Sequence, residues 1–244
     1  MIYANRQGLA MLKWMPRGLL SLCLALPFPA LAQTPDGSVD GDETFLPGFA
    51  CIAPASGTGA PITCEAVVSQ VLPPFYFELF WEMDEAMGER AVTRIAIRQQ
   101  GAAQPFQVIE NVDSRTFPDI ENNGFEVIDL NFDGDLDFRL LAQTTAGPNA
   151  LYRNWLWSPR DQRFEPNETL NEIVSPEFDP DTQEITSRWR SSAAEGGVDI
   201  HMWEAGVPVV IHRETDRYSD QGCTRIFYDR IGGKLEQTGE GRCD

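Results

Sequence analysis

The run D-L-N-F-D-G-D-L-D in the middle of the chain constrains the fold most strongly. Asp129, Asn131, Asp133 and Asp137 place side-chain oxygens at its first, third, fifth and ninth positions. Gly134 stands sixth, where the backbone must turn sharply and glycine does so without a Cβ penalty. A shell of hard oxygens is what Ca²⁺ requires and what softer metals do not favour. The spacing therefore predicts a calcium site, with an acidic turn that holds no metal as the alternative.

The residues around this run predict strands on both sides of it. The seventh position, Asp135, can present its main-chain carbonyl, but the twelfth, where an EF-hand carries a bidentate Glu, is Leu140. Phe125 and Val127 alternate with polar residues before the run, and Phe138 and Leu140 do so after it. Period-two alternation indicates strands rather than paired helices. We therefore expect an EF-hand-like strand–loop–strand site that binds weakly, on the order of 10⁻⁴ to 10⁻³ M.

The first 32 residues have the pattern of an export signal. They carry Arg6, Lys13 and Arg17, no acidic residue, a short apolar run and the ending A-L-A before Gln33. The apolar run is too short for a transmembrane helix. This predicts a signal peptide over 1–32 and a periplasmic or secreted mature protein with no membrane insertion.

The mature chain is strongly acidic. Removal of the three basic residues of 1–32 leaves 16 Lys and Arg against 37 Asp and Glu, a net charge of −21. Such a surface repels nucleic acid and anionic lipid and attracts a basic partner. Residues 33–45 are polar without periodicity and predict a disordered acidic leader. The remainder, 46–244, is long enough for a single domain with a sizeable core.

Four cysteines remain after cleavage: Cys51, Cys64, Cys223 and Cys243. They allow three pairings. The local pairing of Cys51 with Cys64 and of Cys223 with Cys243 is the simplest, because each pair brackets a loop containing Gly or Pro. Zinc is disfavoured by the absence of C-x-x-C spacing. The pattern therefore predicts two structural disulfides.

Short alternating segments separated by turn residues fill most of the mature chain. They predict an all-β fold, propeller-like or a sandwich of many short antiparallel strands. Helical periodicity is scarce, and only 82–90 has the pattern of a short helix. The expected strands are 66–71, 75–81, 92–99, 106–111, 125–129, 136–143, 151–157, 184–190, 199–204, 208–213 and 224–230.

Catalytic signatures are absent from the sequence. His201 and His212 lie in strand-like runs, and no G-x-S-x-G element accompanies them. Some pair of carboxylates can always be found among 37 acidic residues, so such a pair does not indicate a glycoside hydrolase. We therefore expect a protein that is not an enzyme. Its many aromatic residues predict core packing first, with Trp155 and Trp157 as alternative platforms of a glycan-binding envelope module.

One loop is a candidate for partner binding. The segment R-S-S-A-A-E-G-G lies between two expected strands, and its small residues and paired glycines predict a protruding, adaptable hairpin. The alternative is an exposed connection with no role. The candidate residues are Ser191, Ser192, Glu195, Gly196 and Gly197.

Three segments together resemble a known family: V-I-D-L-N-F-D-G-D-L-D-F-R-L-L, G-P-N-A-L-Y-R-N-W-L-W-S-P and P-E-F-D-P-D-T-Q-E-I-T-S. The resemblance is to periplasmic, calcium-binding immunity proteins that protect bacteria against lysozyme-like effectors of a bacteria-killing type IV secretion system. It implies a propeller-like β fold and a protein that inhibits a basic, lysozyme-like peptidoglycan hydrolase. The matching calcium positions are Asp129, Asn131, Asp133, Asp135 and Asp137. Inhibitors of this type carry a Ser-Gly loop with a nearby Tyr, and 191–197 has Ser and Gly but no following Tyr.

Overall fold

The computed structural model describes residues 48–54, 59–144 and 148–243. They fall within one compact unit, Glu43–Asp244. The expected signal peptide and acidic leader lie outside the described residues. Within the described ranges, no helix has both the length and the apolar character needed to cross a bilayer.

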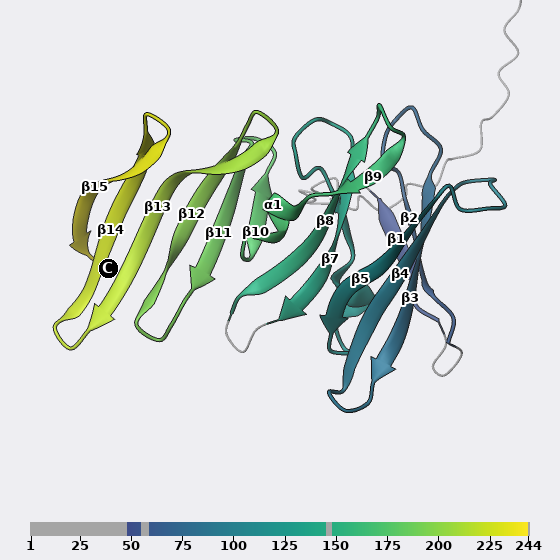
Figure 1. Ribbon diagram of the computed structural model, residues 1–244, viewed down its shortest axis with the longest axis horizontal. Coiled ribbons are helices and arrows are strands. Elements are labelled where there is room, and N and C mark those ends of the chain that lie inside the picture. The colour runs from purple at the N-terminus through teal and green to yellow at the C-terminus, as the bar shows by residue number, and fades with distance from the viewer. Residues whose placement is uncertain (1–47, 55–58, 145–147, 244) are drawn as a thin grey trace, which may run out of the picture. The chain divides into compact units, whose positions relative to one another are not determined.

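Three antiparallel sheets contain nearly all the regular secondary structure of the described chain, and within those residues none of the three closes on itself. In each sheet neighbouring strands follow one another in sequence, as Figure 1 shows. The five-stranded sheet contains β1 (Phe49–Ile52), β2 (Ile62–Ala66), β3 (Phe75–Asp84), β4 (Glu89–Gln99) and β5 (Gln107–Thr116). The four-stranded sheet contains β6 (Glu126–Ile128), β7 (Asp137–Thr144), β8 (Ala150–Ser158) and β9 (Arg163–Pro166).

The six-stranded sheet contains β10 (Pro176–Asp179), β11 (Glu184–Arg190), β12 (Glu195–Glu204), β13 (Val207–Ser219), β14 (Gly222–Ile231) and β15 (Lys234–Arg242). Two single helical turns, η1 (Glu121–Gly124) and α1 (Glu168–Asn171), connect strands. Asn167 caps α1, because its side chain accepts the Leu170 N–H. The all-β prediction is confirmed.

Alternation along the strands produces the main core. On β3, Phe75, Phe77 and Leu79 are fully buried, while the residues between them lie on the other face. These side chains pack against the inner face of the four-stranded sheet, so the first two sheets form a sandwich around one cluster. Phe138 of β7 lies at its centre: its ring stacks on Trp155 at 4.8 Å and meets Phe77 at 5.1 Å.

A second, smaller cluster lies beside the six-stranded sheet. It contains Leu130, Leu170, Ile173 and Ile185, with Trp203 packed against them. These residues come from the acidic loop, from α1 and its C-terminal side, and from β11 and β12. The cluster therefore packs the loop and α1 against the third sheet.

Several sequence-based boundaries are wrong. The expected helix at 82–90 is instead the end of β3, a turn and the start of β4. The strand expected at 66–71 lies earlier, as β2. Four strands were not expected, namely β1, β9, β10 and β15. The segment at 82–90 is charged and carries few apolar residues, so cross-strand pairing rather than periodicity determines its structure.

Both disulfides have the local pairing, Cys51–Cys64 and Cys223–Cys243, as predicted. The first joins β1 to β2, where these residues are directly opposite one another. The second attaches the residue after β15 to β14. Structural disulfides form and persist in oxidising compartments, so the pairing indicates an extracytoplasmic protein.

The aromatic core generates a stability prediction. Phe138→Ala should lower the free energy of unfolding by about 3–5 kcal/mol, because it removes a fully buried ring and leaves a cavity among other rings. Chemical denaturation measures the change. Phe117→Ala is the control, since Phe117 is 51% exposed. Equal loss in the two variants would contradict the central position assigned to Phe138.

Candidate metal site and partner-binding hairpin

The acidic run forms the connection between β6 and β7, so the strand–loop–strand arrangement is present. Gly134 has φ +92°, a conformation that favours glycine, as its position in the motif predicted. Phe132 also has a positive φ of 60°, which the sequence did not indicate. Its ring lies 6.3 Å from that of Phe178 on β10, and this packing holds the strained residue in place.

Side-chain oxygens of the loop accept hydrogen bonds from its own backbone. Asp129 accepts the N–H groups of Asp133 at 3.1 Å and Gly134 at 2.9 Å. Asn131 also accepts the Asp133 N–H, and Asp133 accepts that of Asp135 at 2.9 Å. Such Asx-type bonds are typical of tight turns. They orient the oxygens while each oxygen keeps a lone pair for a cation.

Asp137 is the most unusual member of the motif, because its side chain is completely buried. One carboxylate oxygen accepts the Leu130 N–H and the other accepts the Trp157 N–H, both at 2.8 Å. Burial raises the pKa of Asp137 to about 8, with the charges of Asp133 and Asp129 as smaller contributions. Burial also raises the pKa of Asp129. A bound cation would counteract both effects by favouring the charged carboxylates.

The carboxylates and the amide of the loop are ligand types that a hard divalent cation prefers, but among the described residues the loop's acidic side chains do not bring three ligand atoms within 4.8 Å of one another. The group of three acidic, His or Cys residues that does have its ligand atoms within 4.8 Å of one another, among the described residues, consists of Asp216, Cys223 and Cys243. Those two cysteines form a disulfide, so that group is no metal site. At the loop, the Asn131 amide and the Asp135 carbonyl would complete the set of oxygens.

Apolar residues fix the loop between its neighbours. Leu130 is fully buried, and its carbonyl accepts a hydrogen bond from the Trp203 indole of β12 at 3.1 Å. The Leu136 N–H donates to the Val68 carbonyl, beyond β2, at 2.7 Å. The loop therefore contacts the six-stranded sheet and the segment that follows β2. Sequence reasoning missed these contacts, because each joins residues far apart in the chain.

The candidate partner-binding residues separate into a turn and a strand. Ser191 and Ser192 lie in the exposed turn between β11 and β12, where both N–H groups donate to the Glu195 carbonyl. Glu195, Gly196 and Gly197 are the first residues of β12 rather than part of a flexible loop. The predicted hairpin is present, but its protruding part is shorter than expected.

The two glycines have packing roles. A Cβ at Gly197 would lie 2.1 Å from the Glu214 carbonyl oxygen and 2.7 Å from the Trp189 ring, and a Cβ at Gly196 would lie 3.0 Å from the Trp189 carbonyl oxygen. Trp189 lies directly opposite Gly197 on β11 and donates from its indole to Asp199 at 3.0 Å. Gly197 is therefore required for the close approach of β11, β12 and β13.

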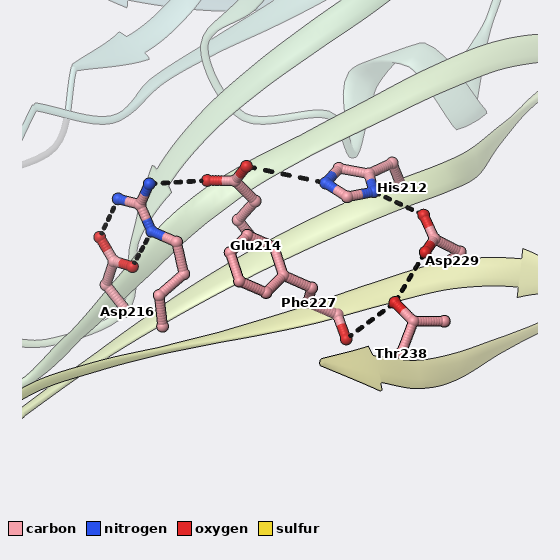
Figure 2. Close-up of polar contacts among 7 residues, drawn as sticks. His212, Glu214, Asp216, Phe227, Asp229 and Thr238 are labelled. Carbon is pink, nitrogen blue, oxygen red and sulfur yellow. Dashed lines mark hydrogen bonds and ion pairs between the residues drawn. The ribbon is translucent and has the colours of Figure 1, made fainter. Parts of the chain in front are cut away.

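A polar ladder crosses the last three strands (Figure 2). Arg225 of β14 binds both oxygens of Asp216 on β13, at 2.7 and 2.8 Å, and also Glu214 at 3.0 Å. The Arg225 hydrogen bonds hold the pKa of Asp216 below its usual value. Two carboxylates therefore neutralise this guanidinium.

The same ladder continues through His212 toward the sheet edge. Its Nδ1 lies 2.7 Å from an oxygen of Asp229, and its Nε2 lies 3.7 Å from Glu214. Asp229 accepts a further hydrogen bond from the Thr238 hydroxyl of β15 at 2.6 Å. Hydrogen bonds from Thr238 and His212 lower the pKa of Asp229. The ladder joins β13, β14 and β15 on one face of the sheet.

Ser187, Asp199 and His201 lie together on β11 and β12, but each has a separate partner. The Ser187 hydroxyl donates to the Val174 carbonyl at 2.6 Å, and the His201 Nδ1 lies 3.3 Å from the Ile185 carbonyl. Asp199 binds Arg213 and Trp189. Burial lowers the pKa of His201. These three side chains do not hydrogen-bond one another as a nucleophile–base–acid set requires.

Trp155 and Trp157 belong to the main core, with 6% and 3% of their surface exposed. They cannot present flat ring faces to a sugar. The glycan-platform alternative therefore loses the two residues on which it depended.

The glycine packing predicts a strong effect of one methyl group. Gly197→Ala should lower thermal stability markedly, because the new Cβ overlaps the Glu214 carbonyl and backbone must shift. Gly241→Ala on β15 is the control, since a Cβ there meets no atom within 4 Å. Differential scanning calorimetry measures both variants. A Gly197→Ala melting temperature as high as that of Gly241→Ala would contradict this packing role.

Comparisons with known proteins give one match, at the level of fold. No protein-family model matches the chain, and no curated protein matches it. A solved structure described as "Structure of a Xanthomonas Type IV Secretion System related protein" is similar with a TM-score of 0.55 and 14% sequence identity. The similarity covers 79% of this chain and 99% of that chain. At this identity the match shows a shared fold.

Proposed function

We propose that this protein is a periplasmic, calcium-stabilised, non-enzymatic inhibitor that binds a basic, lysozyme-like peptidoglycan hydrolase. The observation that carries the proposal is the fold shared with a type IV secretion system related protein over nearly all of that protein's length. The sequence segments that resemble immunity proteins against secreted lysozyme-like effectors support the same function independently.

Calcium belongs to the proposal because of the loop. Asp129, Asn131, Asp133 and Asp137 would supply side-chain oxygens, and Asp135 its carbonyl. When bound, the ion would supply the positive charge that the buried Asp137 carboxylate lacks. Because the loop contacts β12 and the segment that follows β2, this binding would stabilise the folded chain by mass action.

The partner surface is assigned to the turn between β11 and β12, with Ser191 and Ser192 at its exposed part. Exposed turns on rigid strands are well suited to insertion into a cleft. The mature net charge of −21 would steer a basic hydrolase toward the protein and accelerate association. Glu195, Gly196 and Gly197 then support the turn rather than adapt to the partner.

The calcium assignment predicts a ligand-dependent melting temperature. Free calcium at 100 times the Kd should stabilise the mature protein by about 2.7 kcal/mol, which corresponds to a rise of about 5–10 °C for a domain of this size. Asp133→Ala should abolish the rise, because it removes a ligand. Thermal melts with calcium and with a chelator measure it.

Asp135→Ala is the matched control within the same loop. Its side chain is not in the proposed ligand set, and its carbonyl remains after the substitution, so the calcium-dependent rise should persist. A rise that is absent from the unmodified protein, or equally large in Asp133→Ala, would refute the calcium site.

The inhibitor assignment predicts a one-to-one complex and loss of muralytic activity when the mature protein is mixed with its target. Ala193→Arg should weaken inhibition of a basic lysozyme-like hydrolase by about tenfold or more, because it adds bulk and repulsive charge at the turn. Ala193 is exposed, so the fold should be unaffected.

Asp181→Arg, in the exposed turn between β10 and β11, is the control. It changes the charge more than Ala193→Arg does, yet it should leave inhibition nearly intact. The panel should include lysozyme-like effectors of type IV secretion systems and periplasmic hydrolases. Full activity of every member at stoichiometric protein would refute the function, and equal effects of both substitutions would refute the assigned turn.

A further inference from the structure

A pocket of about 510 Å³ opens on the six-stranded sheet beside the turn between β11 and β12. Gly196 and Gly197 line it through their backbone, and their amide groups can therefore report on a ligand bound beside them. Its volume lies within the usual range of small-ligand sites. Its lining includes Arg188, Arg190, Tyr218 and Arg225, together with the acids Glu177 and Asp216.

Arg190 is held in position by uncharged groups. Its Nε donates to the Ser192 carbonyl at 3.0 Å, and one terminal nitrogen donates to the Ala193 carbonyl at 2.9 Å. Its guanidinium also lies 6.0 Å from the centre of the Tyr218 ring. Carbonyl groups orient the guanidinium without cancelling its charge. It therefore remains a preorganised cation with donors to spare.

The other two arginines differ in their charge balance. Arg225 is neutralised by Asp216 and Glu214. Arg188 is exposed, and no acidic side chain among the described residues forms an ion pair with it. Glu177 also lines the pocket and offsets one of the two remaining charges. The three arginines are balanced by Glu177, Asp216 and Glu214, so the pocket is close to neutral as a whole, but Arg188 and Arg190 form no ion pair among the described residues, on a chain whose mature net charge is −21.

We propose that this pocket binds a small ligand through a planar carboxylate, with Arg188 and Arg190 as donors and the Tyr218 ring against the apolar part. Guanidinium forks match carboxylates in two-point hydrogen bonds. Long-range repulsion by the acidic surface disfavours anions in general, so binding requires these directed contacts. The inference does not depend on the proposed hydrolase inhibition.

The test is a titration of the isotopically labelled mature protein with N-acetyl-glutamate, followed through the backbone amide signals of Gly196 and Gly197. These signals should shift saturably. The diamide of the same compound, which lacks both carboxylates, should not shift them. Inorganic phosphate at equal ionic strength separates recognition of the whole ligand from attraction of any anion, and it should bind at least about tenfold more weakly, because it has no apolar part to pack against the Tyr218 ring.

Arg188→Gln should weaken binding by about tenfold or more, the effect of losing one charge-assisted hydrogen bond. The side chain is exposed, so this variant should keep the fold even if Arg190→Gln disturbs the turn. Arg163→Gln, an exposed arginine of β9 that does not line the pocket, is the matched control. It should bind like the unmodified protein.

Three results would overturn the inference: equal shifts with the diamide, equal affinity for phosphate, or unchanged affinity in Arg188→Gln. None of these results bears on the proposed inhibition of a hydrolase. Conversely, absence of inhibition with normal carboxylate binding would refute the proposed function and leave the pocket established.

Discussion

The buried carboxylate of Asp137 is the constraint on which the rest of the structure depends. It begins β7, and its two oxygens join the loop backbone at Leu130 to the β8 backbone at Trp157. A buried carboxylate is costly unless it is hydrogen-bonded, and burial raises its pKa to about 8. The loop must therefore close tightly around this group. Its closure also places Leu130 in the second cluster and within reach of the Trp203 indole.

This arrangement separates stability from recognition. The loop and the aromatic sandwich hold the first two sheets together, whereas the proposed partner turn and the carboxylate pocket belong to the six-stranded sheet. That sheet is reinforced by the Cys223–Cys243 disulfide and by the polar ladder through Arg225 and His212. A rigid sheet allows exposed turn residues to act without reorganisation, which favours tight binding. The proposed calcium ion would then have a structural role.

The candidate site shows which features can be predicted from the spacing of residues in the sequence. Gly134 has the positive φ that its place in the motif predicted, and both cysteine pairs formed as expected, because each depends on residues close in sequence. Gly196 and Gly197 were interpreted as a flexible loop, but they lie in a strand where Trp189 and the Glu214 carbonyl leave no room for a Cβ. No sequence pattern marked Arg190 as a candidate binding residue, because its orientation depends on hydrogen bonds to the Ser192 and Ala193 carbonyls.

The sequence by itself determined the all-β class, most strand positions, the local disulfides and the oxygen-rich loop, because alternation and short-range spacing act directly on the backbone. The tertiary structure alone decided which segments form edge strands and which side chains are exposed. β15 carries too few alternating apolar residues to be predicted, and it forms because β14 offers unpaired hydrogen-bonding groups. Trp155 and Trp157 became core residues because a second sheet covers their face. Such contacts join distant segments, and no local pattern encodes them.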